Sequence, residues 1–231
     1  MNRLRHLAAA SLLAACAPAL APANAEFAIR WDPTEGGPQT GQEVLAALGL
    51  APGKEQDFVV RYFTVAQPDQ LPEGFAAIAR ERTSADHAEA TYKLRGPAPF
   101  PTSGPLHKWQ CPLKGHADSK EEVDIGWTGD GEPKRAYSRS CTADVGAAKA
   151  MPKELKAQPL GCSAATRRVE AGGIKVERWD LQGARQLIEV STSGKDSAQD
   201  FERFRQRVVA PLLERKVKPL KDSKTEMSSA C

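Results

Sequence analysis

Polar and apolar residues alternate most regularly in segment 89–96, which reads Glu-Ala-Thr-Tyr-Lys-Leu-Arg-Gly. In an extended chain, Thr91, Lys93 and Arg95 lie on one face, and the residues between them lie on the other. This period of two predicts a β-strand with a basic face and an apolar face.

Two other segments carry pairs of like charges at the same spacing. Arg80 and Arg82 share a face of the preceding segment, and Glu122 and Asp124 share a face of a later one. Strands of this kind predict a sheet that lines a charged cavity. Such a cavity suits a polyanion, together with a metal ion held by the acids.

Alternation and runs of β-branched or aromatic residues predict further strands along the chain. These strands fall at residues 27–31, 58–64, 75–84, 108–113, 121–128, 134–142, 163–170, 174–181 and 185–191. Turns rich in proline and glycine separate them, and no internal repeat is present.

Helices are predicted near both ends of this run of strands. Thr40 and Glu43 form a capping box before a short apolar stripe, and Ser197 and Asp200 form another before a longer C-terminal helix. A third, short helix is predicted at 147–155. The whole pattern predicts an α+β protein, an antiparallel and mostly meandering β-barrel or tunnel of about eight or nine strands.

The first residues have the features of an export signal. An apolar run over residues 7–20 follows a basic start and leads to the small-residue cleavage site Ala23-Asn-Ala25. The run also contains a lipobox-like Leu-Ala-Ala-Cys ending at Cys16. Residues 1–25 are therefore predicted to be a signal peptide, or a lipoprotein signal that ends before Cys16. Both interpretations place the protein outside the cytoplasm, in the periplasm, either soluble or lipid-tethered.

Charge and length limit the partners and the domain count. The chain has 32 Lys and Arg and 29 Asp and Glu residues, and removal of residues 1–25 takes away two basic ones, so 30 − 29 leaves a net charge of +1. This balance argues against nucleic acid and membrane surfaces as partners. No later segment has the ~20 apolar residues of a transmembrane helix. We expect one domain at 26–217 and a polar tail at 218–231, in an oligomeric state that the sequence leaves open.

The cysteines beyond Cys16 favour disulfides. They are Cys111, Cys141, Cys162 and Cys231, an even number in an oxidising compartment, which predicts two disulfides of open pairing. The two histidines near Cys111 could instead join it in a metal site, but their spacing matches no compact ligand motif.

The charged strand faces have a second interpretation. A polar face of an antiparallel sheet is often its solvated outer face, so Lys93 and Arg95 need not line a cavity. Several cations in one cavity are costly unless an anionic guest or interleaved carboxylates compensate them. The sequence pattern alone favours the solvated-face interpretation.

The order of these segments resembles the CYTH, or triphosphate-tunnel, family, which includes adenylate cyclases and thiamine or inorganic triphosphatases. The resemblance spans nearly the whole mature chain but rests on short motifs. They are the opening strand, the early helix 42–50, Arg61-Tyr-Phe63, Ile78-Ala-Arg-Glu-Arg82, Ala90-Thr-Tyr-Lys-Leu-Arg-Gly96, the acidic strand 121–125, Leu187-Ile-Glu-Val190 and Asp222-Ser-Lys-Thr-Glu226. The resemblance implies an eight-stranded antiparallel tunnel, and thus a CYTH-like domain at 26–217, in which basic residues bind a triphosphate and acids bind a divalent metal ion.

Carried over by position, the resemblance also implies site residues. The phosphate contacts would be Arg30, Arg80, Arg82, Lys93 and Arg95, and the ligands of Mg²⁺ or Mn²⁺ would be Glu122, Asp124 and Glu189. The opening strand departs from the family pattern Glu-x-Glu-x-Lys, because Ala28 stands where the second acid belongs. Glu26 would become the N-terminus after cleavage, and we therefore expect it to be a poorly fixed ligand.

Three hypotheses on function follow. The preferred one is an exported tunnel protein that binds a small phosphorylated anion of the triphosphate or polyphosphate type, with its hydrolysis by a Mg²⁺- or Mn²⁺-dependent mechanism left open by the sequence. The second is a non-catalytic binding or envelope interaction module on the same fold, which Ala28 favours. The third is a lipocalin-like carrier of an apolar ligand, in which Tyr92 and Leu94 would face inward.

Overall fold

The computed structural model describes residues 23–68, 71–101, 103–104, 106–115, 118–129, 131–146 and 151–229, except for the side chains of Asp118 and Cys162. Most of the predicted export signal, including Cys16, lies outside these residues. Asn24 and Ala25, at the end of that signal, are the first two residues of strand β1.

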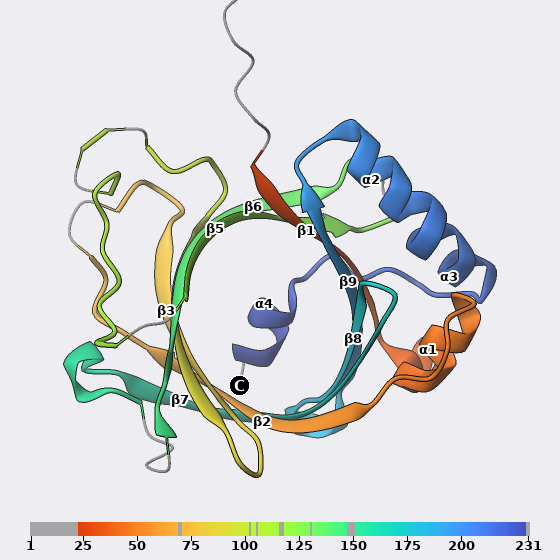
Figure 1. The fold of residues 1–231 in the computed structure, drawn as a ribbon, viewed down its shortest axis with the longest axis horizontal. Helices are drawn as coiled ribbons and strands as arrows, with labels where there is room; N and C mark the ends of the chain where they lie inside the picture. Colours follow the sequence, from red (N-terminus) through yellow and green to blue (C-terminus); the bar gives the residue numbers. More distant parts are fainter. Residues whose placement is uncertain are drawn as a thin grey trace, which may run out of the picture.

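Nine strands close into one barrel (Figure 1). They are β1 (Asn24–Trp31), β2 (Glu55–Thr64), β3 (Ala76–Thr83), β4 (Ala88–Gly96), β5 (Asp118–Trp127), β6 (Lys134–Asp144), β7 (Gln158–Ala171), β8 (Ile174–Asp180) and β9 (Gln186–Lys195). Their order around the barrel is β1-β5-β6-β4-β3-β2-β7-β8-β9, and β9 pairs with β1 to close it. The predicted closed barrel is confirmed.

One pair of strands is parallel. β5 lies between β1 and β6 and runs parallel to β1, whereas every other pair of neighbours is antiparallel. The meander is interrupted here because the chain leaves β4 in a long connection, places β5 beside β1, and returns with β6 to pair with β4. Segment 108–113 lies in this connection and is irregular, contrary to the predicted strand. Pro112 has no N–H to donate to a ladder.

The helical elements lie at the ends of the run of strands and in its connections. They are α1 (Gly41–Ala47), α2 (Ala198–Phe204), the π-helical turn η5 (Arg205–Val209), α3 (Ala210–Glu214), α4 (Lys224–Ser229) and the 3₁₀ turns η1 (Pro33–Glu35), η3 (Lys153–Leu155) and η4 (Gln182–Ala184). The predicted caps form, since Thr40 and Ser197 accept hydrogen bonds from the backbone N–H groups of Glu43 and Asp200. The helix predicted at 147–155 falls partly outside the described residues, and its described end is η3. No helix in the described ranges is long and apolar enough to cross a membrane.

Helices α1 to α3 cover the outside of the barrel at β1, β8 and β9 (Figure 1). Phe27 on β1 stacks on Phe204 of α2 with ring centroids 5.8 Å apart, and Val44 and Leu45 of α1 are buried in the same cluster. Since alternate residues point to opposite faces, the packing of Phe27 outward places Glu26 and Ala28 inward.

A second apolar cluster lies outside β3, β4 and β6. Tyr92 and Leu94 pack there with Phe100, Leu106 and Leu113 of the long connection. The expectation attached to a lipocalin-like carrier is therefore wrong, because Tyr92 and Leu94 face away from the lumen. The long connection supplies the apolar partners that hold them outside.

The C-terminal segment enters the barrel. Figure 1 shows α4 inside the ring of strands, although residues 218–231 were expected to form a polar tail. Leu220 and Met227 pack against the buried inward-facing residues Tyr62, Trp179 and Leu187. One part of the lumen is therefore apolar and filled.

A disulfide joins the long connection to β6. Cys111 and Cys141 are bonded, with their Cα atoms 5.9 Å apart. This confirms one disulfide and removes Cys111 as a metal ligand. His116 and Cys231 lie outside the described residues, and so does the side chain of Cys162.

Candidate functional site

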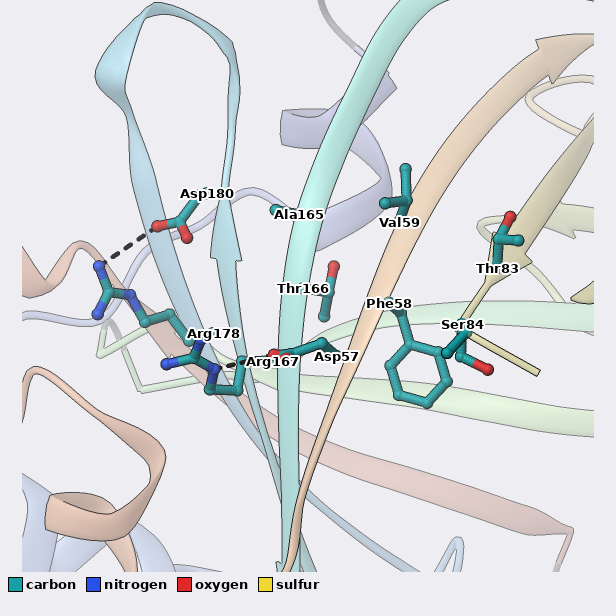
Figure 2. A pocket seen from close by; sticks show the side chains of 11 residues that line it. Asp57, Phe58, Val59, Thr83, Ser84, Ala165, Thr166, Arg167, Arg178 and Asp180 are labelled. Atoms are coloured by element: carbon teal, nitrogen blue, oxygen red, sulfur yellow. Dashed lines mark hydrogen bonds and ion pairs between the residues drawn. The ribbon is translucent and has the colours of Figure 1, made fainter. Parts of the chain in front are cut away.

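A groove of about 570 Å³ runs over β2, β7 and β8 (Figure 2). Its charged residues form ion pairs with one another, Arg167 with Asp57 at 2.9 Å and Arg178 with Asp180 at 3.3 Å. Asp57 and Arg167 are more than half exposed, and exposed pairs of this kind contribute little energy. We therefore do not assign chemistry to this groove.

The charged residues singled out from the sequence gather instead in the lumen of the barrel. A cavity of about 200 Å³ lies there. It is lined by Glu26, Tyr62, Ile78, Arg80, Arg82, Thr91, Lys93, Lys120, Glu122, Ser140, Thr142, Arg168, Lys175, Lys224 and Thr225. Seven of these residues are basic and two are acidic, so the cavity favours an anion.

Arg80, Arg82, Lys93 and Glu122 thus share one cavity, as their alternation along β3, β4 and β5 suggested. Thr91, the third residue of the polar face of β4, also lines it and accepts a hydrogen bond from Arg80 at 3.2 Å. The solvated-face interpretation does not hold for these strands, because their other faces carry the outer apolar clusters.

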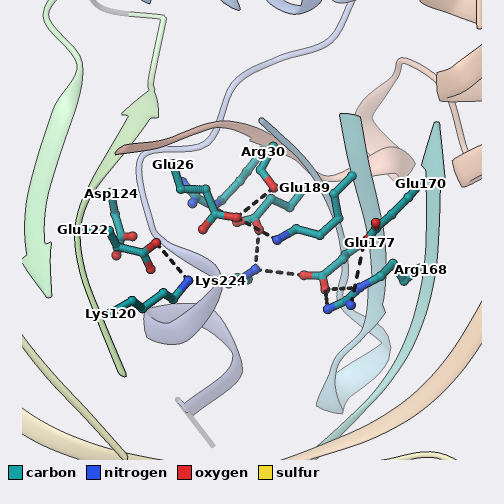
Figure 3. Close-up of polar contacts among 12 residues, drawn as sticks. Glu26, Arg30, Lys120, Glu122, Asp124, Arg168, Glu170, Glu177, Glu189 and Lys224 are labelled. Atoms are coloured by element: carbon teal, nitrogen blue, oxygen red, sulfur yellow. Dashed lines mark hydrogen bonds and ion pairs between the residues drawn. The ribbon is translucent and has the colours of Figure 1, made fainter. Parts of the chain in front are cut away.

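Three carboxylates meet at one side of the lumen. Glu26 pairs with Asp124 in the parallel register of β1 and β5, and Glu122 lies two residues before Asp124. One oxygen of each residue lies within 4.8 Å of the others. Figure 3 shows Glu26 near Glu122 and Asp124. Lys175 donates to Glu26 at 2.8 Å and Lys93 donates to Asp124 at 3.1 Å.

This acidic trio of Glu26, Glu122 and Asp124 has the donor set for a hard divalent cation. Mg²⁺ and Mn²⁺ prefer carboxylate oxygens, and Asp124 Oδ1 is buried with no hydrogen-bond partner in the described part of the chain. An oxygen in that position can accept a metal ion without losing an existing bond. The residues present therefore fit such an ion.

Glu26 is expected to be poorly fixed once it is the N-terminus, and in the full chain its side chain is held by two donors. Ser191 donates to the same oxygen as Lys175, at 3.0 Å. Burial alone would raise the pKa of Glu26, but the positive charges of Lys175 and Lys224 outweigh it and keep that pKa well below its usual range. Glu26 therefore stays ionised as a ligand must.

A second carboxylate group lies deeper in the lumen. Glu177 and Glu189 face each other across β8 and β9, and both are buried. Lys224 of α4 bridges them (Figure 3). Arg30 donates to Glu189, and Arg82 and Arg168 donate to Glu177. Glu189 is thus held by cations and is not part of the acidic trio.

The remaining predicted residues occupy intermediate places. Arg30 is engaged by Glu189, and neither Arg30 nor Arg95 lines the cavity. Arg95 donates to Ser223 at 3.0 Å and lies 3.5 Å from Asp124.

Like charges concentrate around β3. Burial lowers the pKa of Arg82 to about 10, and the nearby charge of Arg80 adds to the effect. The guanidinium groups of Arg82 and Arg168 also lie over the ring of Phe58, at 5.3 and 5.1 Å from its centroid. The lumen therefore holds arginines whose positive charge is only partly compensated.

Several lumen residues were not identified from the sequence as site residues. Alternation places Lys175 and Glu177 on one face of a strand, whereas Arg168 stands in none of the motifs that carry the resemblance. The motif Asp222-Ser-Lys-Thr-Glu226 contained Lys224, and it was the only signal for that residue.

Comparison with known proteins adds a limited finding. No protein-family model and no curated protein matches this sequence. The resemblance to the CYTH family implies an eight-stranded antiparallel tunnel, and the structure shows a tunnel-like closed barrel that differs in having nine strands and one parallel pair. Solved structures with a similar course of the chain include the PH1819 protein of Pyrococcus horikoshii, at 12% identity over 87% of this chain and 96% of that chain, with a TM-score of 0.47.

Two further structures have a similar course. One is a candidate adenylate cyclase from Vibrio parahaemolyticus, at 12% identity over 91% of this chain and 99% of that chain, with a TM-score of 0.48. The other is a candidate adenylyl cyclase from Hippeastrum, described as having a dominant triphosphatase activity, at 12% identity over 87% of this chain and 92% of that chain, with a TM-score of 0.45. The function proposed below rests on the tunnel of this chain.

Proposed function

We propose that the tunnel binds a small phosphorylated anion of the triphosphate or polyphosphate type together with a divalent metal ion. The observation that carries this proposal is the closed lumen with seven basic side chains around about 200 Å³. Cations confined in this way repel one another, and an anionic guest compensates them. Arginine clamps phosphate oxygens in pairs, and lysine acts as a point charge.

The proposed roles follow the two charge groups. Arg80, Arg82 and Lys93 bind phosphate oxygens, while Glu122, Asp124 and Glu26 hold Mg²⁺ or Mn²⁺. A metal ion bound there would polarise a phosphoryl oxygen and neutralise its charge. Arg30 and Arg95, which the resemblance implies as phosphate contacts, instead contact Glu189 and Asp124, and we assign them the role of orienting these carboxylates.

Hydrolysis of the anion is the catalytic form of this proposal, and binding without chemistry is the alternative. Ala28 supports the alternative, since it is buried in the lumen where the resemblance implies a second acid. We further propose that the protein acts outside the cytoplasm, because residues 1–25 have the features of an export signal and Cys111 and Cys141 form a disulfide.

Thermal unfolding with tripolyphosphate and Mn²⁺ tests the proposal. A ligand at ~100 times its dissociation constant raises the free energy of unfolding by about 2.7 kcal/mol, a readily measured shift. Lys93→Met removes the ammonium and keeps most of the side-chain stem, so this variant should lose most of the ligand-induced shift.

Lys218→Met is the matched control, because Lys218 is 70% exposed and lies 4.0 Å from its partner Glu35. It should retain the full shift. An equal shift in the wild type and in Lys93→Met would contradict anion binding in the lumen. Release of phosphate from tripolyphosphate in Mn²⁺, measured on the same samples, separates hydrolysis from binding alone.

A further inference from the structure

Glu177 and Glu189 form a buried pair of like charges. They are directly opposite in the register of β8 and β9, and each side chain is 1% exposed. Two carboxylates this close and this buried repel one another strongly unless a cation lies between them. In many proteins a divalent metal ion takes such a place.

Here a side chain of the same protein takes it. Lys224 Nζ donates to Glu177 Oε2 at 2.8 Å and also to Glu189 Oε1. Burial would lower the pKa of Lys224, but Glu177 and Glu189 outweigh it and raise that pKa above its usual value. The lysine is therefore a charged ammonium inside the barrel.

The other oxygens of the pair are also occupied. Glu177 Oε1 accepts from Arg168 at 2.8 Å and from Arg82 at 3.3 Å, and Glu189 Oε2 accepts from Arg30. All four carboxylate oxygens thus have cationic donors. In the acidic trio, by contrast, Asp124 Oδ1 has no such partner in the described ranges.

We propose that Lys224 is a resident cation that occupies, between Glu177 and Glu189, the place of a divalent metal ion. The metal capacity of the tunnel is then confined to the acidic trio, and Glu189 is not a metal ligand. The resident-cation role goes beyond the proposed function and does not depend on it, because the carboxylate pair needs a cation whether or not an anion binds. Only the assignment of the remaining metal site to the acidic trio rests on the proposed function.

The same contact fixes the C-terminal segment. Lys224 is the first residue of α4, and the ammonium lies 5.8 Å from the centroid of the Trp179 ring. Met227 and Leu220 place apolar side chains against the inward-facing cluster of Tyr62, Trp179 and Leu187. The lysine therefore couples the charge of the pair to the position of α4.

The test counts bound Mn²⁺ in the full chain after treatment with EDTA. Lys224→Met removes the ammonium and leaves two buried carboxylates. We expect this variant to bind one more Mn²⁺ per chain than the wild type. In EDTA, this variant should also unfold at a lower temperature than the wild type. Addition of Mn²⁺ should raise the unfolding temperature of the variant more than that of the wild type.

Two variants serve as controls. Lys224→Met combined with Glu189→Gln should bind no additional Mn²⁺, because one ligand of the new site is gone. Lys218→Met, which changes an exposed lysine shortly before α4, should behave as the wild type. An unchanged Mn²⁺ count in folded Lys224→Met overturns the proposal.

Glu189→Gln alone provides a second measurement, which does not require Lys224→Met to fold. If Lys224 is the resident cation, the wild type and Glu189→Gln bind the same number of Mn²⁺ ions. Loss of one ion in Glu189→Gln would show that Glu189 is a metal ligand and would overturn the proposal. Neither readout requires tripolyphosphate, so failure of anion binding would leave this test intact.

Discussion

Glu177 offers a direct test of how the charges in the lumen are balanced. It is a buried carboxylate on β8 that contacts three cations, Arg168 and Lys224 at 2.8 Å and Arg82 at 3.3 Å. Glu177→Gln keeps the shape of the side chain and removes its charge. The three cations then remain inside the barrel with one fewer counter-charge, Arg82 buried and the other two partly buried.

The expected loss of stability is large. Breaking a buried ion pair by neutralising one partner costs about 3–5 kcal/mol, because an uncompensated charge stays inside the protein. For a chain of roughly 200 residues, each 1 kcal/mol lowers Tm by about 2–4 °C. We therefore expect Glu177→Gln to lower Tm by roughly 6–20 °C in the absence of an anion.

The same substitution should strengthen anion binding. At an effective dielectric constant of ~20, a unit charge ~10 Å away contributes about 1.7 kcal/mol per unit charge of the anion. Because tripolyphosphate carries several charges, its dissociation constant should fall by more than tenfold. The variant is thus less stable alone and gains more stability from the ligand.

The assay is thermal or urea unfolding of wild type and variant, with and without tripolyphosphate, over a series of pH values. Burial would raise the pKa of Glu177, but Lys224 and Arg82 outweigh it and hold that pKa well below the ordinary 4.5. Because the pKa of Glu177 is lower in the folded than in the unfolded chain, its charge stabilises the fold at pH values above the unfolded-state pKa. This stabilisation is lost as the pH falls towards the folded-state pKa. The difference between wild type and variant should therefore shrink in acid.

Glu170→Gln is the matched control. Glu170 lies on neighbouring β7, is 59% exposed and lies 3.7 Å from Arg168, so its replacement should change stability by less than about 1 kcal/mol. A comparably small loss in Glu177→Gln, or an unchanged response to tripolyphosphate, would refute this account of the lumen.

Two further predictions concern the disulfide and the opening strand. Cys111→Ser should lower the free energy of unfolding in urea by about 3–4 kcal/mol, because the disulfide closes a loop with a sequence separation of 30. The variant should keep the tripolyphosphate affinity of the wild type. A loss of stability below about 1 kcal/mol would contradict this prediction. Ala28→Glu should bind Mn²⁺ more tightly than Ala28→Gln in calorimetric titration. Residue 28 faces the lumen next to Glu26, so the new carboxylate adds to the acidic trio. Equal affinities in the two variants would count against metal binding there.

The sequence predicted the strand faces because alternation fixes which residues point the same way. Lys93 and Arg95 must share a face, and Tyr92 and Leu94 must share the opposite one. Which face points inward depends on barrel closure and on the long connection after β4, whose apolar residues cover Tyr92 and Leu94. Alternation along one strand contains neither piece of information.

Contacts between distant segments set the limit of prediction. Glu26 meets Asp124 only because β1 and β5 are parallel neighbours, and a largely meandering barrel gave no reason to expect that pairing. Lys224 reaches Glu177 across a sequence separation of 47, from a segment that looks like a polar tail. Segment 108–113 alternates like a strand, yet it is irregular, because the disulfide and the outer apolar cluster determine its position instead of a strand neighbour.

The polar atoms left without partners favour one kind of ligand over others. Arg80 Nε and Arg82 Nε are buried donors, and Asp124 Oδ1 is a buried acceptor, all without partners among the described residues. A bare anion could accept from Arg80 Nε and Arg82 Nε but would leave Asp124 Oδ1 without a partner, whereas a bare cation would do the reverse. Each unsatisfied group costs about 1–3 kcal/mol or more when charged. A phosphate chain that carries a divalent cation satisfies both kinds at once, and we infer that the complex, rather than either component, is the form that the tunnel fits best.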